Sequence, residues 1–115
     1  MDSILTSVKE LLGMNEEYES FDNDVIIFTN ATIAKLTFLG VGPSEGFRIK
    51  DSNDTWDDYL DEGVIRDLVK EYLQISVKLK FDPPASATIL QAYQETLKND
   101  EFYLTVGVEE VNRNE

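Results

Sequence analysis

Carboxylates are the chemically capable side chains that this sequence offers in number. It contains 23 Asp and Glu residues, no histidine and no cysteine. Without those two residue types, acid–base or nucleophilic catalysis would fall to carboxylates, Ser, Thr, Lys or Tyr. Pairs of acids arise by chance in so acidic a chain, and "GVGPSEG" lacks the Lys-Ser/Thr ending of a phosphate-binding loop. We therefore predict no catalytic residue, no cofactor and no enzyme activity.

One acidic stretch has part of the spacing of a metal site, the calcium loop of an EF-hand. If Asp51 is position one, Asn53 and Thr55 take positions three and five, and Glu62 takes position twelve. Position six requires a glycine for a sharp turn, and here it is Trp56. We interpret this stretch as a solvated acidic turn and predict no metal site.

The acids concentrate in two stretches, residues 14–30 and 51–63, neither of which contains Lys or Arg. The formal net charge of the chain is -13. A protein that grips nucleic acid needs a basic surface to neutralise phosphates, and an anionic membrane surface demands the same. Such acids form an ordinary solvated surface, a surface that must not adhere to DNA, or one that imitates DNA.

Length and hydropathy indicate one globular domain. A chain of 115 residues, 42% of them hydrophobic, can bury one core and is expected to form a single domain, residues 1–115. No apolar run reaches the roughly 18 residues of a membrane span, and the first residues lack the pattern of a signal peptide. We expect an intracellular protein without membrane contact, whose C-terminal residues, roughly 109–115, are frayed.

Apolar spacing predicts a mainly α fold, a small bundle of four to five helices around a structured central loop. The expected helices cover residues near 4–12, 22–39, 65–81 and 86–97, with a short helical turn at 56–60. Ser3 and Ser86 are predicted N-caps, and Asp22 is predicted to cap the second helix. Pro83 must end the third long helix, because it lacks an N–H donor and restricts Asp82. The result is a rigid corner between two antiparallel helices.

Two segments alternate apolar and other residues with period two, which is typical of strands. They are Phe47–Lys50 in the loop and Phe102–Val108 near the C-terminus. We predict a short β element from one or both. Pairing within the molecule is favoured over addition to the sheet of a neighbouring molecule.

The whole chain resembles the head-to-tail connector (adaptor, or head-completion) proteins of tailed bacteriophages. The resemblance rests on the order and spacing of four segments: "ILTSVKELLG", "LTFLGVGPSEGF", "TWDDYL" and, above all, "LKFDPP" between two long helices. It implies a subunit that assembles as a ring beneath the portal protein, extends the DNA channel and docks the next head-completion or tail protein. DNA would pass through without specific binding, and the protein would be part of the virion, assembled in the host cytoplasm.

Candidate site residues follow from placing these patterns in a ring. The candidates for the acidic channel wall or rim are Glu16, Glu17, Glu19, Asp51, Asp54, Asp57 and Asp58. The candidates for contacts with neighbouring subunits or partners are Phe47, Ile49, Phe102, Tyr103, Leu104, Val106 and Val108.

Two rival interpretations remain at this stage. The first is an acidic DNA mimic that inhibits a nucleic-acid enzyme, which should present its acids along one extended face. The second is a small regulatory or toxin–antitoxin-type binding domain. A connector should instead keep apolar and aromatic surface for subunit contacts.

Overall fold

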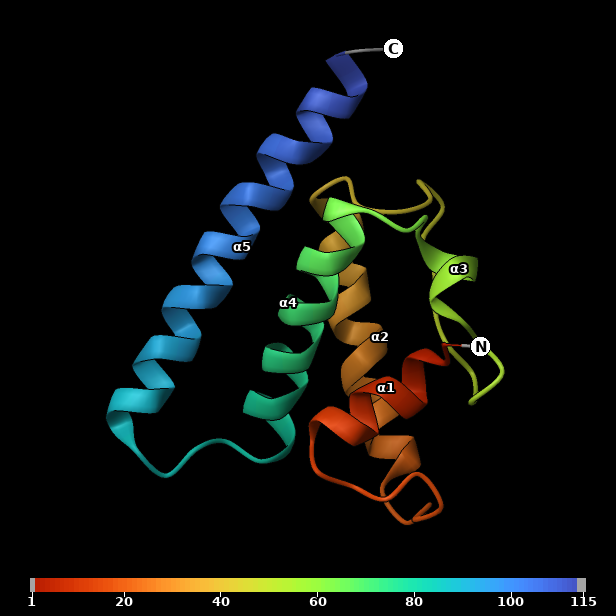
Figure 1. Ribbon diagram of the computed structural model, residues 1–115, viewed down its shortest axis with the longest axis vertical. Coiled ribbons are helices and arrows are strands. Elements are labelled where there is room, and N and C mark those ends of the chain that lie inside the picture. Colours follow the sequence, from red (N-terminus) through yellow and green to blue (C-terminus); the bar gives the residue numbers. More distant parts are fainter. Residues whose placement is uncertain (1, 114–115) are drawn as a thin grey trace.

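The computed structural model describes residues 2–113 and confirms a mainly helical fold. Five helices follow one another in the chain (Figure 1): α1 (Ile4–Leu11), α2 (Asp22–Phe38), α3 (Trp56–Tyr59), α4 (Val64–Phe81) and α5 (Ala87–Arg113). Helix α4 packs against both α2 and α5, and α1 packs against α2 and α4. The molecule is flat, with extents of 44 × 36 × 20 Å.

Most helix ends lie where the sequence predicts them. The Ser3 hydroxyl accepts a hydrogen bond from the Thr6 N–H (3.2 Å), and the Ser86 hydroxyl accepts one from the Ile89 N–H (3.3 Å). Helix α4 ends at Phe81, directly before the Asp82-Pro83-Pro84 corner. The N-cap prediction for Asp22 is wrong, because Asp22 is the first helical residue of α2 and its carboxylate binds Lys9 instead.

The central loop is closed by backbone pairing with the start of α1. Ser3 and Thr55 form an isolated antiparallel bridge, in which the Ile4 N–H donates to the Asp54 carbonyl and the Trp56 N–H donates to the Asp2 carbonyl, both at 3.0 Å. The buried Trp56 and Tyr59 of α3 then anchor the loop in the core, as the short helical turn predicts.

The predicted β element is absent from residues 2–113, which form no sheet. Residues 47–50 lie without a partner strand, because the side chain of Asn30 on α2 takes the place of one. The side-chain amide nitrogen of Asn30 donates to the Ile49 carbonyl (3.0 Å), and the side-chain oxygen of Asn30 accepts from the Ile49 N–H (2.8 Å). One side chain thus supplies the two bonds that a strand would have made.

The second predicted strand, Phe102–Val108, is part of α5. Leu104 and Val108 are four residues apart and lie on the side of α5 that packs on the core, whereas Phe102 and Val106 are exposed on its other side. The alternation therefore reflects a helix with apolar residues on two faces. Helix α5 continues to Arg113, residues 114–115 lie outside the described part, and fraying of residues 109–115 stays a prediction.

Candidate assembly surfaces

The fold brings the two acidic stretches of the sequence together. Glu16, Glu19 and Asp22 from the segment around the start of α2 and Asp51 from the central loop line one open hollow of about 340 Å³. Nothing in the sequence predicts this meeting, because it depends on the bridge between Ser3 and Thr55. We call the exposed residues Glu16, Glu17, Glu19 and Asp51 the acidic surface.

A buried lysine lies beneath the acidic surface. The Lys9 side chain is 3% exposed, and its ammonium group lies 2.7 Å from the Asp22 carboxylate and donates to the Glu16 carbonyl at 2.8 Å. The first acidic stretch lacks a basic residue of its own, yet the fold supplies one from α1. A buried cation with two oxygen partners fixes this segment against α1.

Two of the predicted channel acids hold the central loop together. The Asp54 carboxylate accepts hydrogen bonds from the backbone N–H groups of Lys50 (2.6 Å) and Asp51 (3.3 Å). Asp58 and Thr55 cap α3 reciprocally. These bonds engage Asp54 and Asp58 within the loop.

Asp57 has a comparable structural partner. Its carboxylate lies 2.6 Å from the buried guanidinium of Arg66, which also donates to the Leu60 carbonyl at 3.2 Å. The pair ties α3 to the first turn of α4. Among the residues that the structure describes, no group of three or more potential ligands is arranged to hold a metal ion.

The predicted neighbour contacts divide into buried and exposed residues. Ile49 and Leu104 are fully buried in the core of this chain. Phe47 is half-buried and stacks on Tyr59, with ring centroids 4.8 Å apart. Three members of the set remain exposed on α5: Phe102 (63%), Tyr103 (57%) and Val106 (40%).

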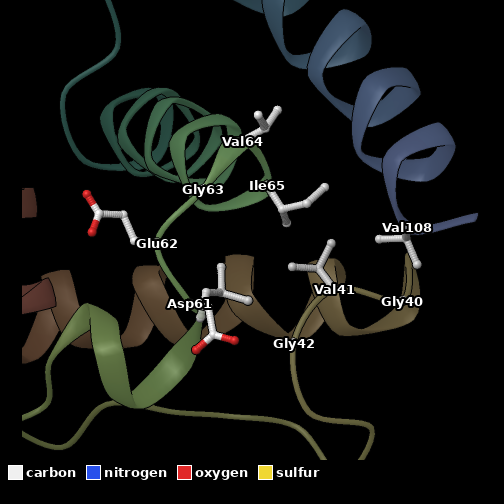
Figure 2. A pocket seen from close by; sticks show the side chains of 10 residues that line it. Gly40, Val41, Gly42, Asp61, Glu62, Gly63, Val64, Ile65 and Val108 are labelled. Carbon is white, nitrogen blue, oxygen red and sulfur yellow. The ribbon is translucent and has the colours of Figure 1, made fainter. Parts of the chain in front are cut away.

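An open apolar cleft of about 550 Å³ lies where the end of α2, the start of α4 and the last part of α5 approach one another. Val41, Ile65 and Val108 surround a common space, and the carboxylates of Asp61 and Glu62 point away from it (Figure 2). Helix α5 comes close here because Gly107 has no side chain: a Cβ at that position would lie 2.7 Å from Cδ1 of Ile65. Val108, a predicted contact residue, is therefore half-covered by its own chain.

Helix α2 exposes two large apolar residues that the sequence analysis does not single out. Phe38 is 92% exposed and Ile27 is 62% exposed. The buried residues of α2, among them Val25, Ile33 and Leu36, lie on its opposite face. The signal was present in the sequence, because α2 is apolar on all sides, which is typical of a helix with partners on more than one face.

A carboxyl group is buried between α4 and α5. Asp100 is 4% exposed and its Oδ2 atom has no hydrogen-bond partner. Burial, followed by the hydrogen bond and the charge of Glu71, raises the pKa of Asp100 to about 7. Beside it the Tyr72 hydroxyl donates to the Glu101 carboxylate at 2.8 Å.

One comparison with known proteins identifies a family for this chain. The family model described as phage connector protein matches residues 4–111. No curated protein and no solved structure matches the chain. Within residues 2–113, none of the helices has both the length and the apolar character that crossing a membrane requires.

Proposed function

Because this chain belongs to the phage connector protein family, we propose that it assembles as a ring beneath the portal protein of a filled capsid. The family is structural, so the chain is a structural component of the phage particle, a head–tail connector. In the proposed ring it extends the DNA channel and docks the next head-completion or tail protein. The match over residues 4–111 is the observation that carries this proposal.

The charge of the molecule supports a role beside moving DNA. The net charge is -13, and the acidic surface gathers carboxylates from two distant parts of the chain at one place. A wall of carboxylates repels phosphates, so DNA slides past without being retained. We place the acidic surface on the channel wall or its rim.

The exposed apolar side chains support assembly. Phe38, Phe102 and Tyr103 are large, and each is more than half exposed. Burying such side chains against a partner yields roughly 1.5–3 kcal/mol for each fully covered residue. Two separate apolar faces on one small chain are suited to contacts with more than one neighbour.

We also propose that the protein joins the particle in the host cytoplasm. The test is therefore an affinity pull-down of the tagged protein from cells that are producing the phage. Recovery of portal and head-completion proteins, identified by mass spectrometry, is the expected result. A matched variant carries Glu16→Gln, Glu17→Gln and Glu19→Gln. It should recover the same virion proteins, since in a connector these acids repel DNA rather than bind a partner.

A different outcome would favour the DNA mimic. If the tagged protein recovers one basic nucleic-acid enzyme and no virion protein, and the triple Gln variant loses that enzyme, the connector proposal is wrong. The carboxylates would then be the binding groups themselves.

A further inference from the structure

Helix α2 carries a second apolar stripe opposite its buried face. Ile27, Ala31, Ala34 and Phe38 follow one another in alternating steps of four and three residues, and all are exposed. This is the spacing of a coiled-coil seam, in which side chains of one helix enter the gaps of another. Two small alanines between Ile27 and Phe38 leave room for large side chains of a partner. We call these four residues the α2 seam.

A hollow adjoins the α2 seam and has one basic and one acidic side chain in its lining. It measures about 450 Å³ and is lined by Ala34 and Phe38 of the seam, by Thr37 beside them, and by Glu45, Gly46, Phe47 and Arg48 of the central loop. Arg48 is exposed, and so is Lys35, which follows Ala34 on α2. Within residues 2–113 the salt bridges of Lys and Arg involve neither Lys35 nor Arg48. Lys35 and Arg48 are therefore two cations beside the α2 seam that are not engaged in these salt bridges.

Helix α5 has a complementary stripe on the face away from α4. Its members also follow steps of four and three residues, and all are exposed: Glu95, Asn99, Phe102, Val106 and Glu109. The Phe102 ring meets that of Tyr103 edge to face, with centroids 5.6 Å apart, so that two aromatic side chains project together. Carboxylates lie at both ends of this stripe, which we call the α5 seam.

We propose that the α5 seam of one subunit docks on the α2 seam of a second copy of this chain, with Phe102 and Tyr103 entering the hollow beside Ala34. The proposal rests on the proposed function, because it names the contact that would build the ring. Large side chains on α5 match small ones on α2, and the carboxylate at one end of the α5 seam, Glu95 or Glu109 according to the relative direction of the two helices, pairs with Lys35 or Arg48.

The arrangement of the helices makes this contact head-to-tail. Helix α4 packs against both α2 and α5 (Figure 1). The members of both seams are exposed, so neither seam is used in this packing. A subunit can then use its α5 seam toward one neighbour and its α2 seam toward the other. Contacts between two different patches close into a ring when the rotation between subunits permits, whereas a self-complementary patch stops at a dimer.

The absence of cysteine from the chain makes the contact testable by engineered disulfides. The double variant Ala34→Cys/Val106→Cys has one cysteine on each seam and keeps Phe102. Oxidation of the concentrated protein should give a ladder of covalent oligomers that dithiothreitol reverses. Each single variant should form at most a small fraction of dimer, since in a head-to-tail contact two copies of one seam do not meet.

The matched control is Ala34→Cys/Val64→Cys. Val64 is an apolar residue with 75% exposure, at the start of α4 and outside both seams, so this variant should form no ladder. In parallel, Phe102→Glu should lower the oligomer fraction in sedimentation velocity at least tenfold, whereas Val64→Glu should leave it unchanged. Circular dichroism verifies that each variant is folded.

Several outcomes overturn the inference. The inference is wrong if the Ala34→Cys/Val106→Cys variant forms no ladder, or if the control variant Ala34→Cys/Val64→Cys forms as much ladder as it does. It is also wrong if a variant with a single cysteine forms as much dimer as the double variant forms ladder. If the pull-down recovers the portal protein but no ladder forms, the connector function stands and the ring uses other faces. If the ladder forms but no virion protein is recovered, the contact stands and the proposed function fails.

Discussion

At the level of single residues, Asp100 couples the contact between α4 and α5 to pH. The groups that face it are Glu71 and Tyr72 from α4 and Glu101 beside it on α5. None of these neighbours is a cation that could stabilise the Asp100 carboxylate. The charged form of Asp100 is therefore disfavoured in the folded protein, where its pKa is about 7. In the unfolded chain the pKa returns to near 3.8, the usual value.

Stability should therefore fall as the pH rises from about 4 to about 7, because the folded state binds a proton that the unfolded state releases. The free energy of unfolding changes by roughly 1 kcal/mol per pH unit at most in this window and levels off above it. In Asp100→Asn this dependence should disappear, and at pH 8 the variant should be more stable than the parent. Urea denaturation at pH 5, 6, 7 and 8 measures both.

The control for this measurement is Asp51→Asn, an exposed acid on the acidic surface. It should retain the pH dependence of the parent. If Asp100→Asn shows the same slope as the parent, Asp100 is not the group that titrates.

At the level of helices and loops, the corner between α4 and α5 determines the direction in which α5 runs. The corner residues Asp82-Pro83-Pro84 stop α4 at Phe81 and let α5 start anew at Ala87. A proline inside a helix costs about 3 kcal/mol, so two of them strongly disfavour one continuous helix from α4 into α5. The corner therefore keeps α5 on the α4 of its own chain.

Replacing Pro83 and Pro84 by alanine should shift the protein toward domain-swapped dimers. The resulting sequence "DAAAS" favours helix, so α4 and α5 can merge and α5 then packs on the α4 of a second chain. Size-exclusion chromatography with light scattering should show a dimer peak that is minor or absent in the parent. In Ser86→Ala, which loses the α5 cap but keeps both prolines, the dimer fraction should stay as in the parent.

The helices show which parts of this fold a sequence can predict. Local signals predict the start of α1, the end of α4 and the start of α5, because Ser3, Pro83 and Ser86 act within a few residues of themselves. The loop conformation at Ile49 is set by Asn30, 19 residues away, and no pattern near Ile49 indicates that partner. The alternation around Leu104 fits a strand and a two-faced helix equally well, and packing on α4 decides between them.

The candidate surfaces were predictable to a similar degree. Exposure of Phe102, Tyr103 and Val106 agrees with their predicted use in contacts, which stays a prediction. The meeting of Glu16 and Glu19 with Asp51 and the presence of Lys9 beneath them depend on tertiary structure. The α2 seam is indicated in the sequence by the number of apolar residues in α2, which exceeds what a single buried face requires.

At the level of the whole molecule, charge and shape together predict how the protein treats DNA. Its net charge is -13, and ion pairs engage Lys9, Arg66, Lys70 and Lys78. Non-specific DNA binding by basic proteins has dissociation constants of about 10⁻⁴–10⁻⁶ M at physiological salt. This protein should show no binding to a labelled duplex by fluorescence anisotropy at about 100 μM, even at low salt.

Reversal of the acidic surface should change that result. A variant with Glu16→Lys, Glu17→Lys and Glu19→Lys changes the net charge by six units and creates a basic stretch. It should bind the duplex weakly and lose binding as salt is added. Retention of DNA by the parent protein itself would contradict a channel wall that DNA slides along.

The bridge between Ser3 and Thr55 also has a consequence during synthesis of the chain. Helix α1 is synthesised before the central loop, yet the Ile4 N–H and the Asp2 carbonyl have their partners in Asp54 and Trp56 of that loop. At about 5–20 residues per second, a ribosome needs several seconds to add the roughly 50 residues in between. During that time the apolar face of α1 has no loop to close against it and remains open to solvent.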